Sequence, residues 1–420
     1  MCCWRAKQSK LGIDSATFHR TYTVRISLLE EPDELESTES DNTVVGKQDL
    51  GKSKTPLQPP EDMQAPRPVP RYPWSQRTLN VLEQSPSPIP RYGHTLSVIS
   101  EGGDGVWLFG GVSDGALTSD VYVLNIQDGA VKRRHTEGTK PTPRMGHAAV
   151  VVKVYEPEMR ESIIVWGGQA NKRDSDLYVF DISSLIWSRL RWTGHGPTGR
   201  VGHTLTADGC RLFMFGGDVE GRPSDELWVC DIDASSHSAT WGRISRADDM
   251  VWPPARVNHT CILHEEHIYL FGGTDYQYHY NDTWMFSIVS HTWVELNVIG
   301  YLPDPSEGHS AALVGDHMYV YGGRDVNAVE TYHLGALDIP HCRWYMFQRM
   351  GRGAGPRADH AVAAVGSEII ILGGEPRSYE ARSANRDEEK KDQHIMHVLD
   401  TGCIKYPDLP RKGTGTNHAQ

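Results

Sequence analysis

The stretch Pro197–Trp228, PTGRVGHTLTADGCRLFMFGGDVEGRPSDELW, decides the fold. It reads as a turn, a strand, a second turn, an apolar strand that ends in two glycines, a loop and a third strand. The run Leu212–Phe215 has no polar face, which is typical of a strand covered on both sides. Trp241 follows and is large enough to fill the gap between two stacked sheets. The stretch therefore predicts one sheet of a structure built by stacking similar sheets.

The same pattern occurs six times, and its most regular feature is a pair of glycines. The first glycines of successive pairs lie 49 to 57 residues apart. Two glycines let the chain turn where φ is positive. The pairs, which number the repeats one to six, are Gly110 and Gly111, Gly167 and Gly168, Gly216 and Gly217, Gly272 and Gly273, Gly322 and Gly323, and Gly373 and Gly374. This period predicts an all-β fold, a six-bladed β-propeller with a disordered N-terminal tail.

Composition and charge exclude several classes of protein. Lys and Arg number 42 against 54 Asp and Glu, a formal net charge of −12. Nucleic-acid binding needs concentrated positive charge, so no nucleic-acid partner is expected. No apolar run reaches the roughly 18 residues of a transmembrane segment, and the N-terminus lacks the apolar core of a signal peptide. The seven cysteines include no Cys-x-x-Cys pair, which fits a reducing, cytoplasmic compartment.

The chain divides into three predicted parts. Residues 1–71 contain an acidic run at Glu30–Asp41 and a proline-rich run at Thr55–Pro70, and are predicted to be a disordered N-terminal tail. Residues 72–410 form the propeller, and 411–420 a flexible C-terminal tail. Cys2 and Cys3 leave two interpretations open, a palmitoylated anchor or an unmodified pair on the tail.

Ring closure is the open question of the architecture. A propeller often closes by borrowing a strand from the opposite terminus. The segment 73–82 carries Trp74 and resembles the outer strand at Ile186–Leu190, so we predict that it supplies the outer strand of repeat six. The alternative is Cys403–Tyr406, which occupies the position of the outer tryptophan in repeat six.

One histidine recurs at the start of each repeat: His94, His147, His203, His259, His309 and His360. A metal site would need several ligands about 2 Å from one ion. Six repeats spread these histidines around a ring, so we predict structural hydrogen bonding and no metal.

Five repeats place an arginine shortly before that histidine: Arg91, Arg144, Arg200, Arg256 and Arg357. Repeat five carries Ser306 or Glu307 instead. Either the arginines form a basic ring that binds carboxylates, or each ties its repeat to carbonyls or acids of a neighbouring loop. The break in repeat five favours the structural role.

These repeats resemble the kelch repeat, in which Pro-Arg-x-Gly-His precedes the double glycine, a third strand and a tryptophan. Longer phrases are similar to fungal kelch cell-polarity proteins, the cell-end markers of the tip-elongation-aberrant type. They are Tyr72-Pro-Trp-Ser, Pro197–His203, Pro254–Thr260, Gly300–His309 and Arg343–Phe347, within a resemblance that covers about 72–410. It implies a protein-binding scaffold in the cytoplasm, at the cell cortex or cell tip. The implied partners are cortical or cytoskeleton-associated polarity factors.

The members of that family usually continue into long coiled coils. This chain has no heptad stretch and ends at Gln420, so its oligomeric state stays open, as does a short paralogue or truncated gene model. We expect no enzyme activity and no cofactor. A copper oxidase on this fold needs a Cys near a Tyr and two converging histidines, and no such cluster is evident. The alternatives are a substrate adaptor for a ubiquitin ligase and a kelch-fold metalloenzyme.

The loops after the double glycines are predicted to share one face with the linkers entering each repeat. They are Asp218–Ser224, Thr274–Tyr280, Arg324–Glu330 and Glu375–Gln393. Tyrosine is enriched at recognition hot spots. We therefore predict a partner-binding site at Tyr276, Tyr278, His279 and Tyr280, with Arg324 and Asp325 supplying polar specificity. The alternatives are that this loop packs its rings on repeat five, or that the site lies on the opposite face at Tyr155–Glu161.

Overall fold

The computed structural model describes residues 72–82, 85–99, 105–155, 159–170, 174–233, 237–246, 250–348, 350–376 and 394–406. Both predicted tails, Cys2, Cys3 and residues 377–393 of the long loop lie outside these ranges. Within them the regular structure is β-strand, apart from one 3-10 turn, η1 (Thr401–Cys403). No helix of the described ranges is long and apolar enough to span a bilayer.

Antiparallel strands in sequence order form the larger described sheets. The first contains β3 (Thr95–Val98), β4 (Gly105–Phe109), β7 (Val121–Asn125) and β8 (Ala130–Arg134), with β2 (Asn80–Val81) parallel to β8. The second contains β10 (Ala148–Tyr155), β11 (Met159–Trp166), β12 (Leu177–Asp181) and β13 (Ile186–Thr193). It continues through parallel pairing of β13 with β19 (Ser238–Ile244) into β18 (Leu227–Asp233), β15 (Arg211–Phe215) and β14 (Thr204–Asp208). Its β13 also pairs with β9 (Glu137–Gly138).

The remaining sheets repeat this order. One contains β20 (Thr260–His264), β21 (His267–Phe271), β22 (Thr283–Ser287) and β23 (Thr292–Glu295). The next contains β25 (Ser310–Val314), β26 (His317–Tyr321), β27 (Leu334–Asp338) and β28 (Arg343–Phe347), with β24 (Ile299–Gly300) parallel to β28. Another contains β30 (Ala361–Val365), β31 (Glu368–Leu372), β33 (Ile395–Asp400) and β1 (Trp74–Thr78). Two-stranded pairs are β5 (Val112–Ser113) with β6 (Ala116–Leu117), β16 (Asp218–Val219) with β17 (Arg222–Pro223), and β29 (Arg357–Ala358) with β32 (Glu375–Pro376).

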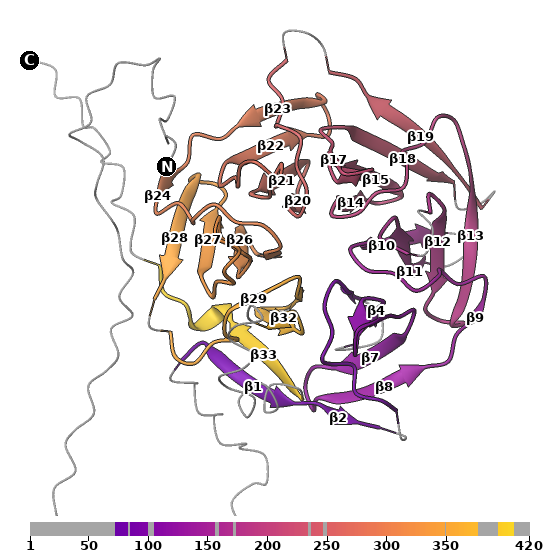
Figure 1. Cartoon of the computed structure of the whole chain (residues 1–420), viewed down its shortest axis with the longest axis horizontal. Coiled ribbons are helices and arrows are strands. Elements are labelled where there is room, and N and C mark those ends of the chain that lie inside the picture. The colour runs from indigo at the N-terminus through magenta and orange to yellow at the C-terminus, as the bar shows by residue number, and fades with distance from the viewer. Residues whose placement is uncertain are drawn as a thin grey trace, which may run out of the picture.

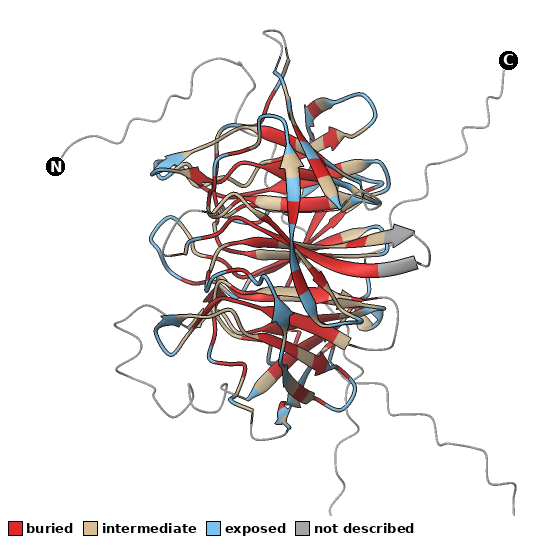
Figure 2. Cartoon of the chain, turned by 90° about the vertical axis from the view of Figure 1, so that its right-hand side faces the viewer, coloured by how far each residue is buried: buried red, intermediate tan, exposed pale blue. Residues whose placement is uncertain are grey.

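The second strand of each repeat is buried on both faces, as the apolar run in Leu212–Phe215 predicts. Its last four residues are all buried in β4, β15, β21, β26 and β31. A strand with no polar side chain must be covered by a sheet on each side. The sheets accordingly stand like blades around a common axis (Figure 1). Seen from the side, burial is greatest within the strands, and the exposed residues lie mainly in loops at both ends (Figure 2).

The innermost strands form a closed circle of contacts. In order, β3 contacts β10, then come β14, β20, β25 and β30, and β30 contacts β3 again. The sheets thus form a propeller-like ring in which the last repeat lies against the first.

The N-terminal segment closes this ring, as predicted. Strand β1 pairs antiparallel with β33, with Trp74 opposite Leu399. The chain then crosses to the next sheet, where β2 pairs with β8. The alternative segment, Cys403–Tyr406, does not supply this outer strand. Its Tyr406 instead packs its ring against Tyr345 and Phe347 of repeat five. The borrowed strand is therefore 74–78 of the predicted 73–82.

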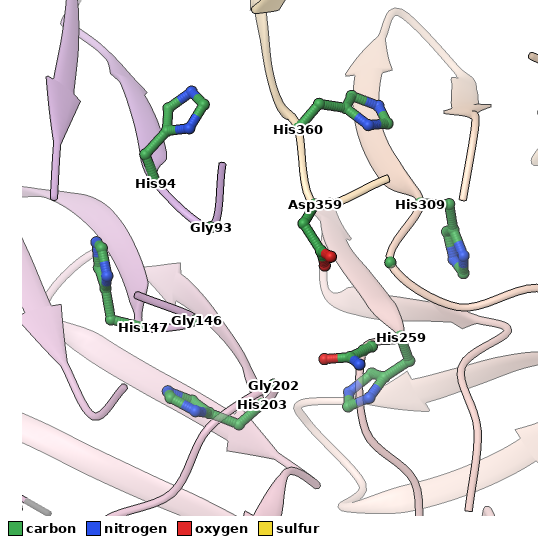
Figure 3. A pocket seen from close by; sticks show the side chains of 12 residues that line it. Gly93, His94, Gly146, His147, Gly202, His203, His259, His309, Asp359 and His360 are labelled. Atoms are coloured by element: carbon green, nitrogen blue, oxygen red, sulfur yellow. The ribbon is translucent and has the colours of Figure 1, made fainter. Parts of the chain in front are cut away.

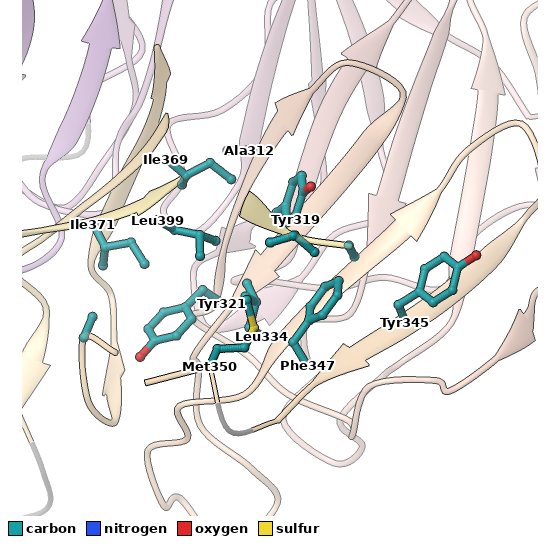
Figure 4. Close-up of a cluster of buried hydrophobic side chains, with 13 residues drawn as sticks. Ala312, Tyr319, Tyr321, Leu334, Tyr345, Phe347, Met350, Ile369, Ile371 and Leu399 are labelled. Carbon is teal, nitrogen blue, oxygen red and sulfur yellow. The ribbon is translucent and has the colours of Figure 1, made fainter. Parts of the chain in front are cut away.

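Aromatic wedges between neighbouring sheets explain the spacing of the tryptophans. Each outer-strand tryptophan contacts the aromatic residue that precedes the double glycine of the previous repeat. The pairs are Trp187 with Phe109, Trp241 with Trp166, Trp293 with Phe215, Trp344 with Phe271, and Trp74 with Tyr321. Figure 4 shows the cluster between repeats five and six, where Tyr321 and Phe347 meet Ile371 and Leu399. Trp74 differs from the others in being only partly buried.

Candidate partner-binding site

A closed ring of backbone hydrogen bonds surrounds the axis. The residue before each recurrent histidine donates its N–H to the carbonyl of the same position in the preceding repeat. The ring runs through Gly93, Asp359, Gly308, Asn258, Gly202, Gly146 and back to Gly93, at N···O distances of 2.8 to 3.1 Å. All of these residues have positive φ. The repeats are thus tied to one another at the centre.

The six histidines line the pocket at the axis, together with those ring residues. Figure 3 shows them arranged around it, with the Asp359 carboxylate directed into its middle. All six are buried. Burial, assisted by Arg91, lowers the pKa of His94 to about 3, so its imidazole is neutral at physiological pH. Neutral buried imidazoles serve as hydrogen-bonding and packing groups.

Hydrogen bonds give some of these histidines their predicted structural role. His147 Nε2 lies 3.1 Å from the Thr95 hydroxyl of the preceding repeat, and His259 Nε2 lies 3.0 Å from Thr204. His309 Nε2 lies 3.2 Å from the Phe271 carbonyl. Among the described residues no group of three His, Cys, Asp or Glu side chains is arranged to hold a metal ion. These three histidines therefore link neighbouring repeats.

The double glycines are required by contacts with these histidines as well as by their positive φ angles. A Cβ on the first glycine would meet the histidine of the next repeat, and one on the second would meet the histidine of its own repeat. At Gly272 it would lie 2.6 Å from His309 Cε1, and at Gly273 it would lie 2.7 Å from His259 Cβ. At Gly373 it would lie 2.8 Å from His94 Cε1, so the same contact joins repeat six to repeat one. Real Cβ contacts this short are essentially never seen.

The arginines act within their own repeats, which corrects the prediction that they reach a neighbouring loop. Arg256 Nη1 donates to the Gly272 carbonyl at 2.9 Å and pairs with Asp282 at 2.7 Å. Arg91, Arg144 and Arg200 repeat this arrangement, and Arg357 donates to Gly373. The five guanidinium groups are buried and donate within their own repeats. The alternative of a basic ring for carboxylates therefore does not hold.

Ser306, not Glu307, takes the arginine position of repeat five. The backbone decides this, because Gly273 N donates to Ser306 O at 2.9 Å as Gly217 N donates to Arg256 O. Glu307 accepts from Asn258 Nδ2 instead, at 3.0 Å.

The tyrosine loop, Thr274–Tyr280, does not pack its rings on repeat five. The Tyr276 hydroxyl donates to Asp218 of repeat three at 2.8 Å, while the ring stays 58% exposed. Tyr280 donates to Asp275 at 2.8 Å and lies under Arg256, 4.2 Å from ring centroid to Cζ. Tyr278 is 66% exposed. Of the three predicted rings, two are presented to solvent and Tyr280 supports the loop.

The polar residues expected to give specificity are engaged within the chain. Arg324 pairs with Asp359 at 2.8 Å and Glu375 at 2.6 Å, across to repeat six. Asp325 accepts from the Val329 N–H at 3.0 Å and so holds its own loop. His279 Nε2 lies 3.7 Å from Glu307. These groups fix the loops in place and contribute little free hydrogen-bonding capacity.

Sequence reasoning missed exposed apolar side chains in repeat five, the repeat that follows the tyrosine loop. Val326 is 62% exposed, Val329 51% and Tyr332 64%, all in or next to the loop of repeat five. The signal was available, since two valines stand in an otherwise polar loop. Together with Tyr276 and Tyr278 they form what we call the aromatic surface. Its loops are held by Asp275 and Asp325, whose carboxylates accept backbone N–H groups.

Comparison with known proteins places these features in a family. Residues 93–323 and 157–374 match the family described as "KLHDC2/KLHL20/DRC7 Kelch-repeats domain". The chain is 30% identical over 345 residues to "Tip elongation aberrant protein 1" of Schizosaccharomyces pombe, covering 80% of this chain and 28% of that protein.

Two further relatives cover similar parts of the chain. "Kelch repeat-containing protein 2" of Saccharomyces cerevisiae is 27% identical, over 79% of this chain and 40% of its own. "Acyl-CoA-binding domain-containing protein 4" of Arabidopsis thaliana is 25% identical, over 78% and 49%. The chain thus spans between about a quarter and a half of these relatives. With its paired glycines, recurrent histidines and propeller-like ring, the chain belongs to the kelch-repeat family.

Proposed function

We propose that this protein is a non-catalytic scaffold that binds a protein partner on the aromatic surface. One observation carries the proposal: Tyr276, Tyr278, Val326, Val329 and Tyr332 expose more than half of their surface on two neighbouring, internally hydrogen-bonded loops. Exposed apolar side chains gathered at one place are typical of interaction sites. Because the loops are already held, partner binding costs little ordering entropy.

The architecture that we propose for this scaffold is a six-bladed propeller. The closed backbone ring takes one residue from each of six repeats, which supports counting the nine-stranded sheet as two blades. Such a ring sets the two loops at fixed positions relative to each other. The boundaries 72–410 and the two flexible tails belong to the same proposal.

We further propose that the partner is a cortical or cytoskeleton-associated polarity factor, and that the protein works in the cytoplasm near the cell cortex or cell tip. Support comes from the similarity to a protein named for aberrant tip elongation. A fluorescent fusion in growing cells is expected to concentrate at tips. A uniform distribution would contradict this part of the proposal.

The second candidate is a substrate adaptor of a ubiquitin ligase, since kelch proteins of several kinds share this fold. The two functions are separated by what co-purifies. Polarity or cytoskeletal proteins would support the scaffold, whereas stoichiometric cullin subunits would support the adaptor. A metal retained through purification would support the metalloenzyme alternative instead.

The test of the binding surface is a triple variant, Tyr278→Ala, Val326→Ser and Tyr332→Ala. Tyr280 is left intact, because its ring packs on Arg256 and its loss would disturb the loop. The expected result is an unchanged melting curve and a partner affinity at least tenfold weaker in quantitative capture, since hot-spot residues each contribute about 2 kcal/mol or more. The matched control is Val251→Ser with Val289→Ser, at residues that are 60% and 69% exposed outside these two loops.

Equal capture by the wild-type protein and a folded triple variant would overturn the proposed site. The hairpin of β10 and β11, where the expanded turn was predicted, is then the next surface to vary.

A further inference from the structure

Repeat five differs from its neighbours at the buried arginine position. In repeat one, Arg91 donates to the Gly110 carbonyl at 2.6 Å and to the Thr118 hydroxyl. In repeat three, Arg200 donates to Gly216 O at 3.0 Å and to Ser224 Oγ at 3.3 Å. Each guanidinium also meets an acid two residues after that hydroxyl, Asp120 or Glu226. In these two repeats a carbonyl, a hydroxyl and a carboxylate therefore form the arginine site.

The backbone identifies the corresponding residues of repeat five. Thr331 N donates to Gly323 O at 2.8 Å, as Thr118 N donates to Gly111 O. Gly322 N donates to His333 O at 3.0 Å, as Gly110 N donates to Asp120 O. The carbonyl of Gly322 and the hydroxyl of Thr331 are thus the acceptors of the arginine site. No described residue donates a hydrogen bond to either of them.

A cavity of about 20 Å³ remains where the arginine side chain lies in the other repeats. Ser306, Gly322, Thr331, His333 and Asp304 are among its lining residues. That volume holds about one water. The side chains of Asp304 and His333 are 60% and 41% exposed, so these two lining residues stand at the molecular surface.

The charge of the arginine site is also present, from a different position. His333 replaces the strand carboxylate, and its Nδ1 lies 3.6 Å from Asp304 Oδ2 in the linker that enters the repeat. Tyr332 of the aromatic surface does not line the cavity, but its ring lies 5.6 Å from that of the lining residue His333. An aromatic ring beside a guanidinium recurs in this chain, at Arg256 with Tyr280. The cavity lining therefore offers a carboxylate to an incoming cation, with an exposed ring next to His333.

We propose that this cavity, widened by rotation of the exposed His333 side chain, binds a guanidinium group, supplied as an arginine side chain of a bound partner. Its planar fork can donate to Gly322 O and Thr331 Oγ1 together while Asp304 balances the charge. An ammonium has no planar fork and fits this acceptor set less well. The prediction that a free guanidinium compound binds depends only on the cavity. The prediction that a partner supplies the arginine rests on the proposed function.

The experiment titrates the full chain with methylguanidinium chloride, and in parallel with methylammonium chloride at equal ionic strength. The expected result is a saturable rise in melting temperature with methylguanidinium and a much smaller response to methylammonium. Ser306→Arg with His333→Asp rebuilds the arginine site from within. That variant is expected to melt higher than the wild type and to lose the response to methylguanidinium.

Two further variants keep the outcome decisive even if the rebuilt site does not fold. Thr331→Val removes one acceptor without changing shape, and Asp304→Asn removes the charge. Each is expected to weaken methylguanidinium binding about tenfold, the effect of losing one charge-assisted hydrogen bond. The control is Asp316→Asn, whose carboxylate is 63% exposed and lies outside the cavity lining.

Equal responses to the two cations, or undiminished binding in Thr331→Val and Asp304→Asn, would overturn the proposal. If methylguanidinium binds as expected while the aromatic-surface variant still captures its partner normally, the proposed function fails and the guanidinium site stands.

Discussion

At the scale of single residues, the double glycines carry two constraints. Both members have positive φ, for example 65° at Gly272 and 93° at Gly273. Both also face a histidine, one in the next repeat and one in their own. The sequence pattern predicts the first constraint, because paired glycines indicate a turn. The second cannot be read from the pair itself, because it depends on how the histidines are placed in the folded ring.

Gly273→Ala separates these constraints when it is compared with Gly209→Ala. Gly209 also has positive φ, but a Cβ there meets nothing within 4 Å. Backbone strain costs about 1–2 kcal/mol at either site. Crowding against His259 Cβ and the Val257 carbonyl, each 2.7 Å from the added Cβ, adds about 1–3 kcal/mol at Gly273. Urea denaturation should give the larger loss for Gly273→Ala. Equal losses at the two sites would show that this crowding is unimportant.

The buried histidines predict how stability depends on pH. The pKa of His94 and of His203 is about 3 and that of His309 about 4 in the folded protein, through burial. Their ordinary value is about 6.5 in an unfolded chain. The unfolded state therefore binds more protons below that pH, and folding stability falls as the pH falls.

Each such histidine contributes a slope of up to about 1.4 kcal/mol per pH unit below pH 6.5. Denaturation at a series of pH values between about 7.5 and 5 should show this decline. His94→Gln should reduce the slope, because it removes one buried imidazole. A free energy of unfolding that stays constant over this range would contradict the neutral, buried state.

At the scale of elements, β1 is the strand on which closure depends. It pairs along its whole length with β33, and Arg77 donates to Glu368 at 3.0 Å. Trp74 fills the same wedge as the other outer tryptophans, but is only partly buried. Sequence similarity to Ile186–Leu190 was sufficient to predict this strand. It could not predict that β2 continues into the neighbouring sheet, since a two-residue parallel pairing leaves no periodic pattern.

Two truncations test closure by β1. Removal of residues 1–70 should leave the melting temperature unchanged. Removal of 1–85 should lower it sharply, because β33 then exposes an unpaired edge and the cluster around Leu399 opens to water. Wild-type stability in the shorter protein would mean that another segment can close the ring.

Substitution of single tryptophans compares how much each one contributes to the free energy of unfolding. Trp187→Ala, at a residue 2% exposed, should cost about 3–5 kcal/mol. Trp74→Ala should cost less, about 2 kcal/mol, because part of its ring already contacts solvent. The free energy of unfolding in urea measures both. A greater loss of unfolding free energy for Trp74→Ala than for Trp187→Ala would contradict the difference in burial between the two residues.

At the scale of the whole molecule, the ring holds the loops of successive repeats at fixed positions relative to one another. The predicted tyrosines do lie on loops after a double glycine, and Tyr276 and Tyr278 are exposed. The ion pairs of Arg324 could not be predicted from sequence, because its partners Asp359 and Glu375 belong to repeat six. Charge networks of this kind join residues that no local pattern relates. The sequence therefore indicates where a surface lies better than which side chains remain available on it.

Hydrogen exchange with a captured partner tests the central proposal most directly. The amides of residues 274–280 and 324–333 should exchange more slowly in the complex than in the free protein. Those of the β10 and β11 hairpin should be unchanged. Protection confined to that hairpin, with the two loops exchanging as in the free protein, would contradict partner binding on the aromatic surface.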